Sequence, residues 1–232
     1  MDWFNFTIDH KDILIYRSVY APVKSNMFTI LTGNEAVVID PNKDDKLLSL
    51  LEEKNVSRVH ILLTHEHYDH ISGVMWLKEK KGVNVYCQTR CAERIAKNRD
   101  KVPRLVAVVL AQQDKEDNGH RYRDFKDGLK PVSVIADRTF DKRDNFKIGN
   151  LVFEATATPG HCPGAACYML FGKMVFTGDS LLQNTPTITR FPESNNEEYE
   201  KISLPFFRSL PKDTIIMPGH GDPFILKDTK NI

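Results

Sequence analysis

The sequence lacks several features that define large classes of protein. None of its apolar runs approaches the length of about eighteen residues that a membrane-spanning helix needs. The first residues, MDWFNFTIDHKD, contain no basic segment followed by an apolar one, which is the pattern of a secretory signal. No internal repeat and no low-complexity tract is present. These absences predict a folded, cytoplasmic protein that does not bind a membrane.

An excess of charge of either sign is also missing, and cysteine is scarce. The chain has 32 Lys and Arg residues against 31 Asp and Glu residues, a net charge of +1. It therefore lacks the positive field that a nucleic-acid backbone requires, and a small-molecule substrate is the expected partner. No pattern specifies an oligomeric state. Two disulfides are conceivable, but the absence of an export signal favours four reduced thiols. The cysteines are Cys87, Cys91, Cys162 and Cys167.

The composition is that of an ordinary folded domain, with 41% hydrophobic and 27% charged residues among 232. In the first half, apolar periodicity predicts strands and helices in alternation. The predicted strands are 13–16, 27–31, 36–39, 59–63 and 83–87, and the predicted helices are 44–54, 71–80 and 90–97. Such alternation predicts an α/β fold in which helices pack on sheets.

The second half predicts a further sheet. Three short strands are expected between residues 146 and 177, with turns at Gly149-Asn150, Pro159-Gly160 and Gly172. A helix is expected at 196–210, capped by Ser194 or Asn195 and kinked at Pro205. A last strand is expected at 214–217.

Residues 98–138 interrupt this alternation. An apolar run, Leu105–Ala111, leads into the densely charged segment QQDKEDNGHRYRDFKDG. We interpret 98–138 as an insertion in a single domain spanning 1–232, and predict that it is a lid or interface element that shapes substrate choice. The alternative is a helix packed permanently on the rest of the domain.

The segment THEHYDH follows the predicted strand that ends at Leu63. It places four possible metal ligands, His65, His67, Asp69 and His70, within six residues. Loops at the carboxyl ends of strands are where α/β folds build sites, because the rigid sheet holds the base of the loop. The alternative is a polar loop with a hydrogen-bonded buried histidine. The density of ligands favours a metal site.

Three later motifs place one ligand each beside a glycine that follows a strand. They are TPGHCPG with His161, FTGDSL with Asp179, and MPGHGDP with His220. A glycine lets the backbone bend tightly and approach a metal closely. Each of these residues alone is also compatible with an ordinary turn. Together with the first motif, they supply seven nitrogen and oxygen ligands.

Seven ligands are too many for one tetrahedral ion, but they suit two divalent ions that share one bridging carboxylate. Imidazole and carboxylate ligands without a thiolate favour zinc and are compatible with iron or manganese. Two such ions would lower the pKa of a shared water. The predicted reaction is hydrolysis of an ester-like bond, a thioester or a lactone, by a metal-bound hydroxide, with Asp69 or Asp179 assisting proton transfer as catalytic residues.

The motifs, in this order and spacing, resemble those of the metallo-β-lactamase-fold hydrolases between about Met27 and Pro223. They are most similar to the glyoxalase II-like, or hydroxyacylglutathione hydrolase-like, branch. The resemblance implies a four-layer αββα sandwich with the metals at one edge of the two sheets. It also implies the division of the ligands: His65, His67 and His161 for the first metal, Asp69, His70 and His220 for the second, and Asp179 as the bridge.

Two further residues are candidates for the site. Asp40, at the end of AVVID, resembles an early aspartate of the family, which implies a hydrogen bond to a ligand imidazole. Its alternative role is that of a turn former beside Pro41. Arg190, on the loop after Asp179, is a candidate for binding a substrate carboxylate, or is an ordinary solvated arginine.

A different chemistry is also compatible with the resemblance. Some relatives use a single iron to oxidise persulfides, so a mononuclear iron persulfide dioxygenase-like enzyme is the alternative function. The presence of Asp69, His70 and His220 as a second ligand set counts against it.

Overall fold

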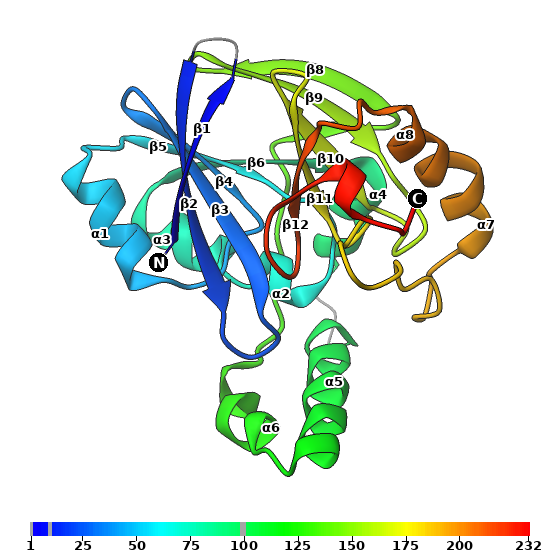
Figure 1. Ribbon diagram of the computed structural model, residues 1–232. Helices are drawn as coiled ribbons and strands as arrows, with labels where there is room; N and C mark the ends of the chain where they lie inside the picture. Colours follow the sequence, from blue (N-terminus) through cyan, green and yellow to red (C-terminus); the bar gives the residue numbers. More distant parts are fainter. Residues whose placement is uncertain (1, 9–10, 98–100) are drawn as a thin grey trace.

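Two β-sheets form the centre of the computed structural model, which describes residues 2–8, 11–97 and 101–232 (Figure 1). The first sheet has the strand order β1-β2-β3-β4-β5-β6-β7. Its strands are β1 (Asp2–Ile8), β2 (Lys11–Tyr20), β3 (Ser25–Thr32), β4 (Glu35–Ile39), β5 (Arg58–Leu62), β6 (Gly82–Gln88) and β7 (Arg138–Phe140). The second sheet has the order β13-β12-β11-β10-β9-β8. Its strands are β8 (Arg143–Ile148), β9 (Leu151–Ala157), β10 (Ala166–Leu170), β11 (Met174–Gly178), β12 (Ile215–Pro218) and β13 (Phe224–Ile225).

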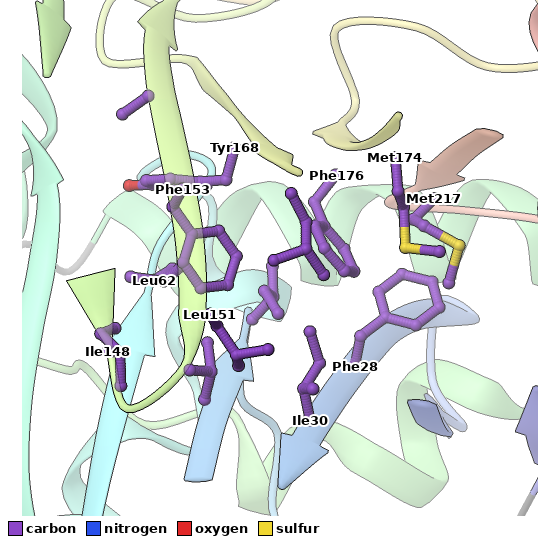
Figure 2. Close-up of a cluster of buried hydrophobic side chains, with 14 of the residues drawn as sticks. Phe28, Ile30, Leu62, Ile148, Leu151, Phe153, Tyr168, Met174, Phe176 and Met217 are labelled. Atoms are coloured by element: carbon purple, nitrogen blue, oxygen red, sulfur yellow. The ribbon is translucent and has the colours of Figure 1, made fainter. Parts of the chain in front are cut away.

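The main core lies between the two sheets. Phe28 and Ile30 of β3 meet Phe153 of β9 and Phe176 of β11 (Figure 2). The ring centroids of Phe28 and Phe176 are 5.6 Å apart in a tilted arrangement, which is favourable for aromatic pairs. Burial of these large side chains from both sheets holds the sheets together.

Helices cover the outer face of each sheet. The first sheet packs against α1 (Asp45–Glu53), α3 (Val74–Lys80) and α4 (Thr89–Ile95). The second packs against α8 (Leu204–Ser209), which follows α7 (Asn196–Glu198) and a π-helical turn, Tyr199–Ser203. The result is the predicted four-layer αββα sandwich. Among the described residues, no helix is both long and apolar enough to span a bilayer.

Most predicted elements are confirmed, and the differences have local causes. The edge strand β1 was not predicted, although Phe4, Phe6 and Ile8 alternate with exposed polar residues as in a half-buried strand; β1 is ordered by pairing with β2. The strand expected at 214–217 corresponds to β12. It is not the last strand, because the two-residue strand β13 follows it. The expected kink at Pro205 takes the form of a π-helical turn ending two residues before it, because proline supplies no N–H for the helical ladder.

The segment 98–138 contains two helices outside the sandwich, α5 (Lys101–Asp117) and α6 (Arg121–Phe125), which project below the sheets in Figure 1. Residues 98–100 lie outside the described part of the chain. The end of the segment differs from the expected insertion. Val134 is buried in the core under the first sheet, its N–H donates to the carbonyl of Ile95, and β7 begins at Arg138.

Candidate metal centre

The four motifs meet at one edge of the sandwich because the strands that precede them run in the same direction. β4 and β5 are parallel, β11 and β12 are parallel, and β9 runs in the direction of β11 because both are antiparallel to β10. Backbone hydrogen bonds join the sheets at this edge. The N–H of Ala166 donates to the carbonyl oxygen of Thr64 at 2.8 Å, and the N–H of Asn26 donates to the carbonyl oxygen of Gly219 at 2.7 Å. The short helix α2 (Tyr68–Ile71) carries Asp69 and His70.

His65, His67 and His161 form the first group of possible ligands. One ring nitrogen of each lies within 4.8 Å of the other two. Nδ1 of His161 is 2.9 Å from the carbonyl oxygen of Ile188, which accepts its proton and leaves Nε2 with a lone pair toward His67. Burial, followed by the neighbouring His161, lowers the pKa of His67 to about 3. Its imidazole is therefore neutral at pH 7, as a metal ligand must be.

Asp69, His70 and His220 form the second group. Their ligand atoms also lie within 4.8 Å of one another. Oδ2 of Asp69 is 3.3 Å from Nε2 of His70 and 3.5 Å from Nε2 of His220. Burial alone would lower the pKa of His70, but the carboxylates of Asp69, Asp179 and Asp40 together raise it well above its usual value. Carboxylates thus surround this half of the site, which suits a cation.

Asp179 lies between the two groups. Its Oδ2 is 3.5 Å from Nε2 of His161 in the first group and 3.4 Å from Nε2 of His220 in the second. Its Oδ1 is 3.6 Å from Nε2 of His70. A carboxylate within reach of ligands from both groups has the position that a bridge between two ions requires.

The ligand atoms also have the properties of a site built for cations. Nε2 of His65, Nε2 of His70 and Oδ1 of Asp179 are buried without a hydrogen-bond partner in the described part of the chain. Buried polar atoms are normally satisfied, so these three atoms have the character of metal ligands. A side chain at Gly219 would overlap Oδ1 of Asp179 and come within 2.9 Å of His70, so only glycine permits this close approach. The residues present therefore fit divalent metal ions.

A cavity of about 230 Å³ opens onto the candidate ligands. Five of the seven line it: His67, Asp69, His161, Asp179 and His220. A second cavity, of about 290 Å³, adjoins it and shares His67 and Leu105 as lining residues. A small molecule can therefore reach the ligands from a space walled by the protein.

Comparisons with known proteins agree with this geometry. Residues 20–220 match the family model of the metallo-beta-lactamase superfamily. The chain belongs to this superfamily. Hydroxyacylglutathione hydrolase GloC of Haemophilus influenzae is 30% identical over 190 residues, which cover 80% of each chain. A probable metallo-hydrolase of Bacillus subtilis, YqgX, is 25% identical over 88% of this chain and 89% of its own.

Solved structures show the same fold. TTHA1623, crystallised in a di-iron-bound form, has a TM-score of 0.68 and 24% identity, with coverage of 91% of this chain and 95% of its own. ETHE1 from Myxococcus xanthus has a TM-score of 0.64 and 22% identity, with coverage of 92% and 80%. The His and Asp clusters of this superfamily member indicate divalent metal ions, and the two curated relatives described above are named as a hydrolase and a probable metallo-hydrolase.

Asp40 lies directly behind the candidate metal ligands. Its Oδ2 is 2.9 Å from Nδ1 of His70 and accepts the hydroxyl of Thr64 at 2.6 Å, while Oδ1 accepts the N–H of Thr64 at 2.7 Å. The carboxylate thus places a proton on Nδ1 of His70 and leaves Nε2 toward Asp69 and Asp179.

Asp40→Asn is expected to weaken metal binding about 10- to 100-fold. The backbone of residue 40 has φ +53°, a conformation that asparagine tolerates, so the local fold should persist. The new amide cannot accept all three hydrogen bonds, and an NH₂ facing His70 forces the proton onto Nε2. Competition with a chelator measures the affinity. Asp213→Asn, at an exposed carboxylate, is the matched control. Equal affinities in both variants would contradict this role of Asp40.

Arg94 lines the second cavity, although the sequence did not single it out. Arg190 is exposed and lines neither cavity described above, so its role in substrate binding stays a prediction. Arg94 lies on α4, and its Nε is 2.6 Å from Oε1 of Glu66, the residue between His65 and His67. No motif surrounds Arg94, so only the folded chain reveals this contact.

Proposed function

We propose that this chain hydrolyses a thioester or lactone with two divalent metal ions held by seven side chains. The proposed first ion is held by His65, His67 and His161, the second by Asp69, His70 and His220, with Asp179 as the bridge. The observation that carries the proposal is the position of Asp179, within 3.6 Å of nitrogens from both groups. The relative named hydroxyacylglutathione hydrolase, at 30% identity, supports a thioester substrate.

The chain's own residues bind the metals, orient the substrate and move a proton. Two divalent ions in this position would polarise a substrate carbonyl and lower the pKa of a shared water. In the net reaction, a C–O bond to water oxygen forms and the thioester C–S bond, or the lactone C–O bond, breaks. Asp69 and Asp179 line the cavity, and we assign to them the transfer of a proton from the attacking water to the leaving thiolate or alkoxide.

Zinc is the proposed metal because the ligands are imidazole and carboxylate groups. Iron is the second candidate, supported by the structural neighbour that was crystallised in a di-iron-bound form. The small-molecule substrate and the cytoplasmic location expected from the sequence belong to the same proposal.

The alternative, a mononuclear iron persulfide dioxygenase-like activity, requires only one ion. The convergence of Asp69, His70 and His220 as a second group favours the dinuclear hydrolase.

Chelator-sensitive hydrolysis tests the proposed function. Metal-replete protein is expected to cleave members of a panel of thioesters and lactones, to lose this activity when chelator removes the metals, and to regain it when zinc is restored. The readout is the free thiol or the acid released. Persulfide oxidation with no cleavage of any thioester, lactone or phosphoester would replace the hydrolase with the alternative.

A further inference from the structure

The cavity beside the candidate metal centre has apolar walls. We infer that the acyl side of the substrate is an uncharged, apolar chain that lies against α5, an inference that rests on the proposed hydrolase function. It concerns specificity within the site and is separate from the metal ligands.

One wall comes from a single face of α5. Leu105, Val106 and Val109 line the cavity and follow the spacing of one helical face. Val108 lies outside this cavity lining and its exposure is 65%. The helix therefore presents three aliphatic side chains to the candidate site, with Gln113 one turn further along, while Val108 is exposed to solvent.

This wall is fixed to the helix that carries two candidate ligands. Val106 and Leu110 are buried against Tyr68, the first residue of α2, and the Tyr68 hydroxyl donates to the carbonyl of Gly128 at 3.1 Å. α5 therefore keeps a set position relative to Asp69 and His70. This packing favours a permanent wall over a freely moving lid.

A second part of the wall comes from the loop after β11. Leu182, Ile188 and Phe191 line the same cavity. The ring of Phe191 is 5.8 Å from that of His161 and 6.0 Å from that of His67, centroid to centroid. An acyl chain whose carbonyl lies beside these histidines would meet carbon surfaces from α5 and from this loop.

Apart from the candidate ligands, the described residues that line this cavity are uncharged. Among the described residues that line it, the only acids are the candidate ligands Asp69 and Asp179, and no lysine or arginine takes part. Arg94 and Lys97 line the neighbouring cavity instead, where Arg94 is paired with Glu66 and Glu193. Between these walls and away from the candidate ligands, a charged acyl end would lose its hydration without gaining a charged partner, whereas an alkyl chain gains from burial.

A series of acyl thioesters that share one thiol tests the inference. We expect kcat/KM to rise about fourfold for each methylene buried, from acetyl through butanoyl to hexanoyl. The succinyl thioester, which ends in a carboxylate, is expected to react at least about tenfold more slowly than the butanoyl thioester because its charge is desolvated without a partner.

A matched pair of substitutions tests whether the acyl chain of the substrate lies against α5. Val109→Phe adds volume inside the cavity, so the ratio of hexanoyl to acetyl kcat/KM is expected to fall at least about tenfold. Val108→Phe makes the same change on the exposed face and should keep the wild-type ratio. Circular dichroism and metal content verify that both variants fold. Equal ratios in the two variants, or hydrolysis with no preference for apolar chains, would overturn the inference.

Binding of a hexyl thioether and of its carboxylate-ended analogue, measured by calorimetry, separates this inference from the proposed function, because neither compound can be hydrolysed. Tighter binding of the hexyl compound that is lost in Val109→Phe supports the apolar pocket even if no ester is cleaved. Failure of both binding and hydrolysis would overturn the pocket and the hydrolase together.

Discussion

Asp179→Ala is expected to remove metal from both halves of the site and to lower kcat/KM at least about a hundredfold. Asp179 is the only described carboxylate within 3.6 Å of nitrogens from both groups. Substitution of a residue that only hydrogen-bonds a metal ligand typically lowers metal affinity or activity about 10- to 100-fold. Loss of a bridging ligand should lower both by more. Elemental analysis and turnover of the proposed thioesters give the two readouts.

The expected pattern distinguishes a bridge from an ordinary ligand. His220→Ala removes a ligand from the second group only, so it should leave the ion of the first group in place. Asp213→Ala, at an exposed carboxylate outside the site, should retain the wild-type metal content. Full retention of one ion in Asp179→Ala would show that this carboxylate does not serve both groups.

Arg94→Ala is expected to lower the free energy of unfolding by about 3 kcal/mol. The Glu66 side chain is only 6% exposed, and Arg94 is its cationic partner. Removing Arg94 leaves a carboxylate buried without a counter-charge, the situation in which loss of one partner costs most. The value is at the low end of the usual range because the Arg94 side chain is 20% exposed. Denaturant unfolding of the metal-free protein measures the change without a contribution from bound ions.

Arg90 provides a control on the same helix. Its side chain is 46% exposed and pairs with Glu198, so Arg90→Ala should change the free energy of unfolding by no more than about 1 kcal/mol. Adding Glu66→Gln to Arg94→Ala removes the uncompensated charge and should recover part of the loss. Equal effects of the two arginine substitutions would show that the Glu66–Arg94 pair contributes little.

The helices and strands that the sequence predicted best have strong local signals. The predicted helix 44–54 corresponds to α1, because Asp44 caps it by accepting from the N–H of Lys46 at 2.9 Å and leucines follow at helical spacing. The HEHYDH motif was recognisable because its ligands are adjacent in the chain. Features of this kind depend on residues that are close together in the sequence.

The features that the sequence missed depend on contacts between distant residues. Arg94 meets Glu66 only because α4 packs beside the loop after β5. The apolar run Leu105–Ala111 was recognisable in the sequence, but not which of its side chains would line the candidate site, nor that Val108 would face solvent. These relations follow from how the sheets and helices pack together, which hydrophobic periodicity does not encode.

The metal-to-protein ratio of metal-replete wild-type protein tests the central claim most directly. Elemental analysis is made on protein loaded with zinc, and separately with iron, after unbound metal is removed. The two groups of ligands joined by Asp179 predict two ions per chain. A ratio that saturates at one ion per chain would contradict the dinuclear centre.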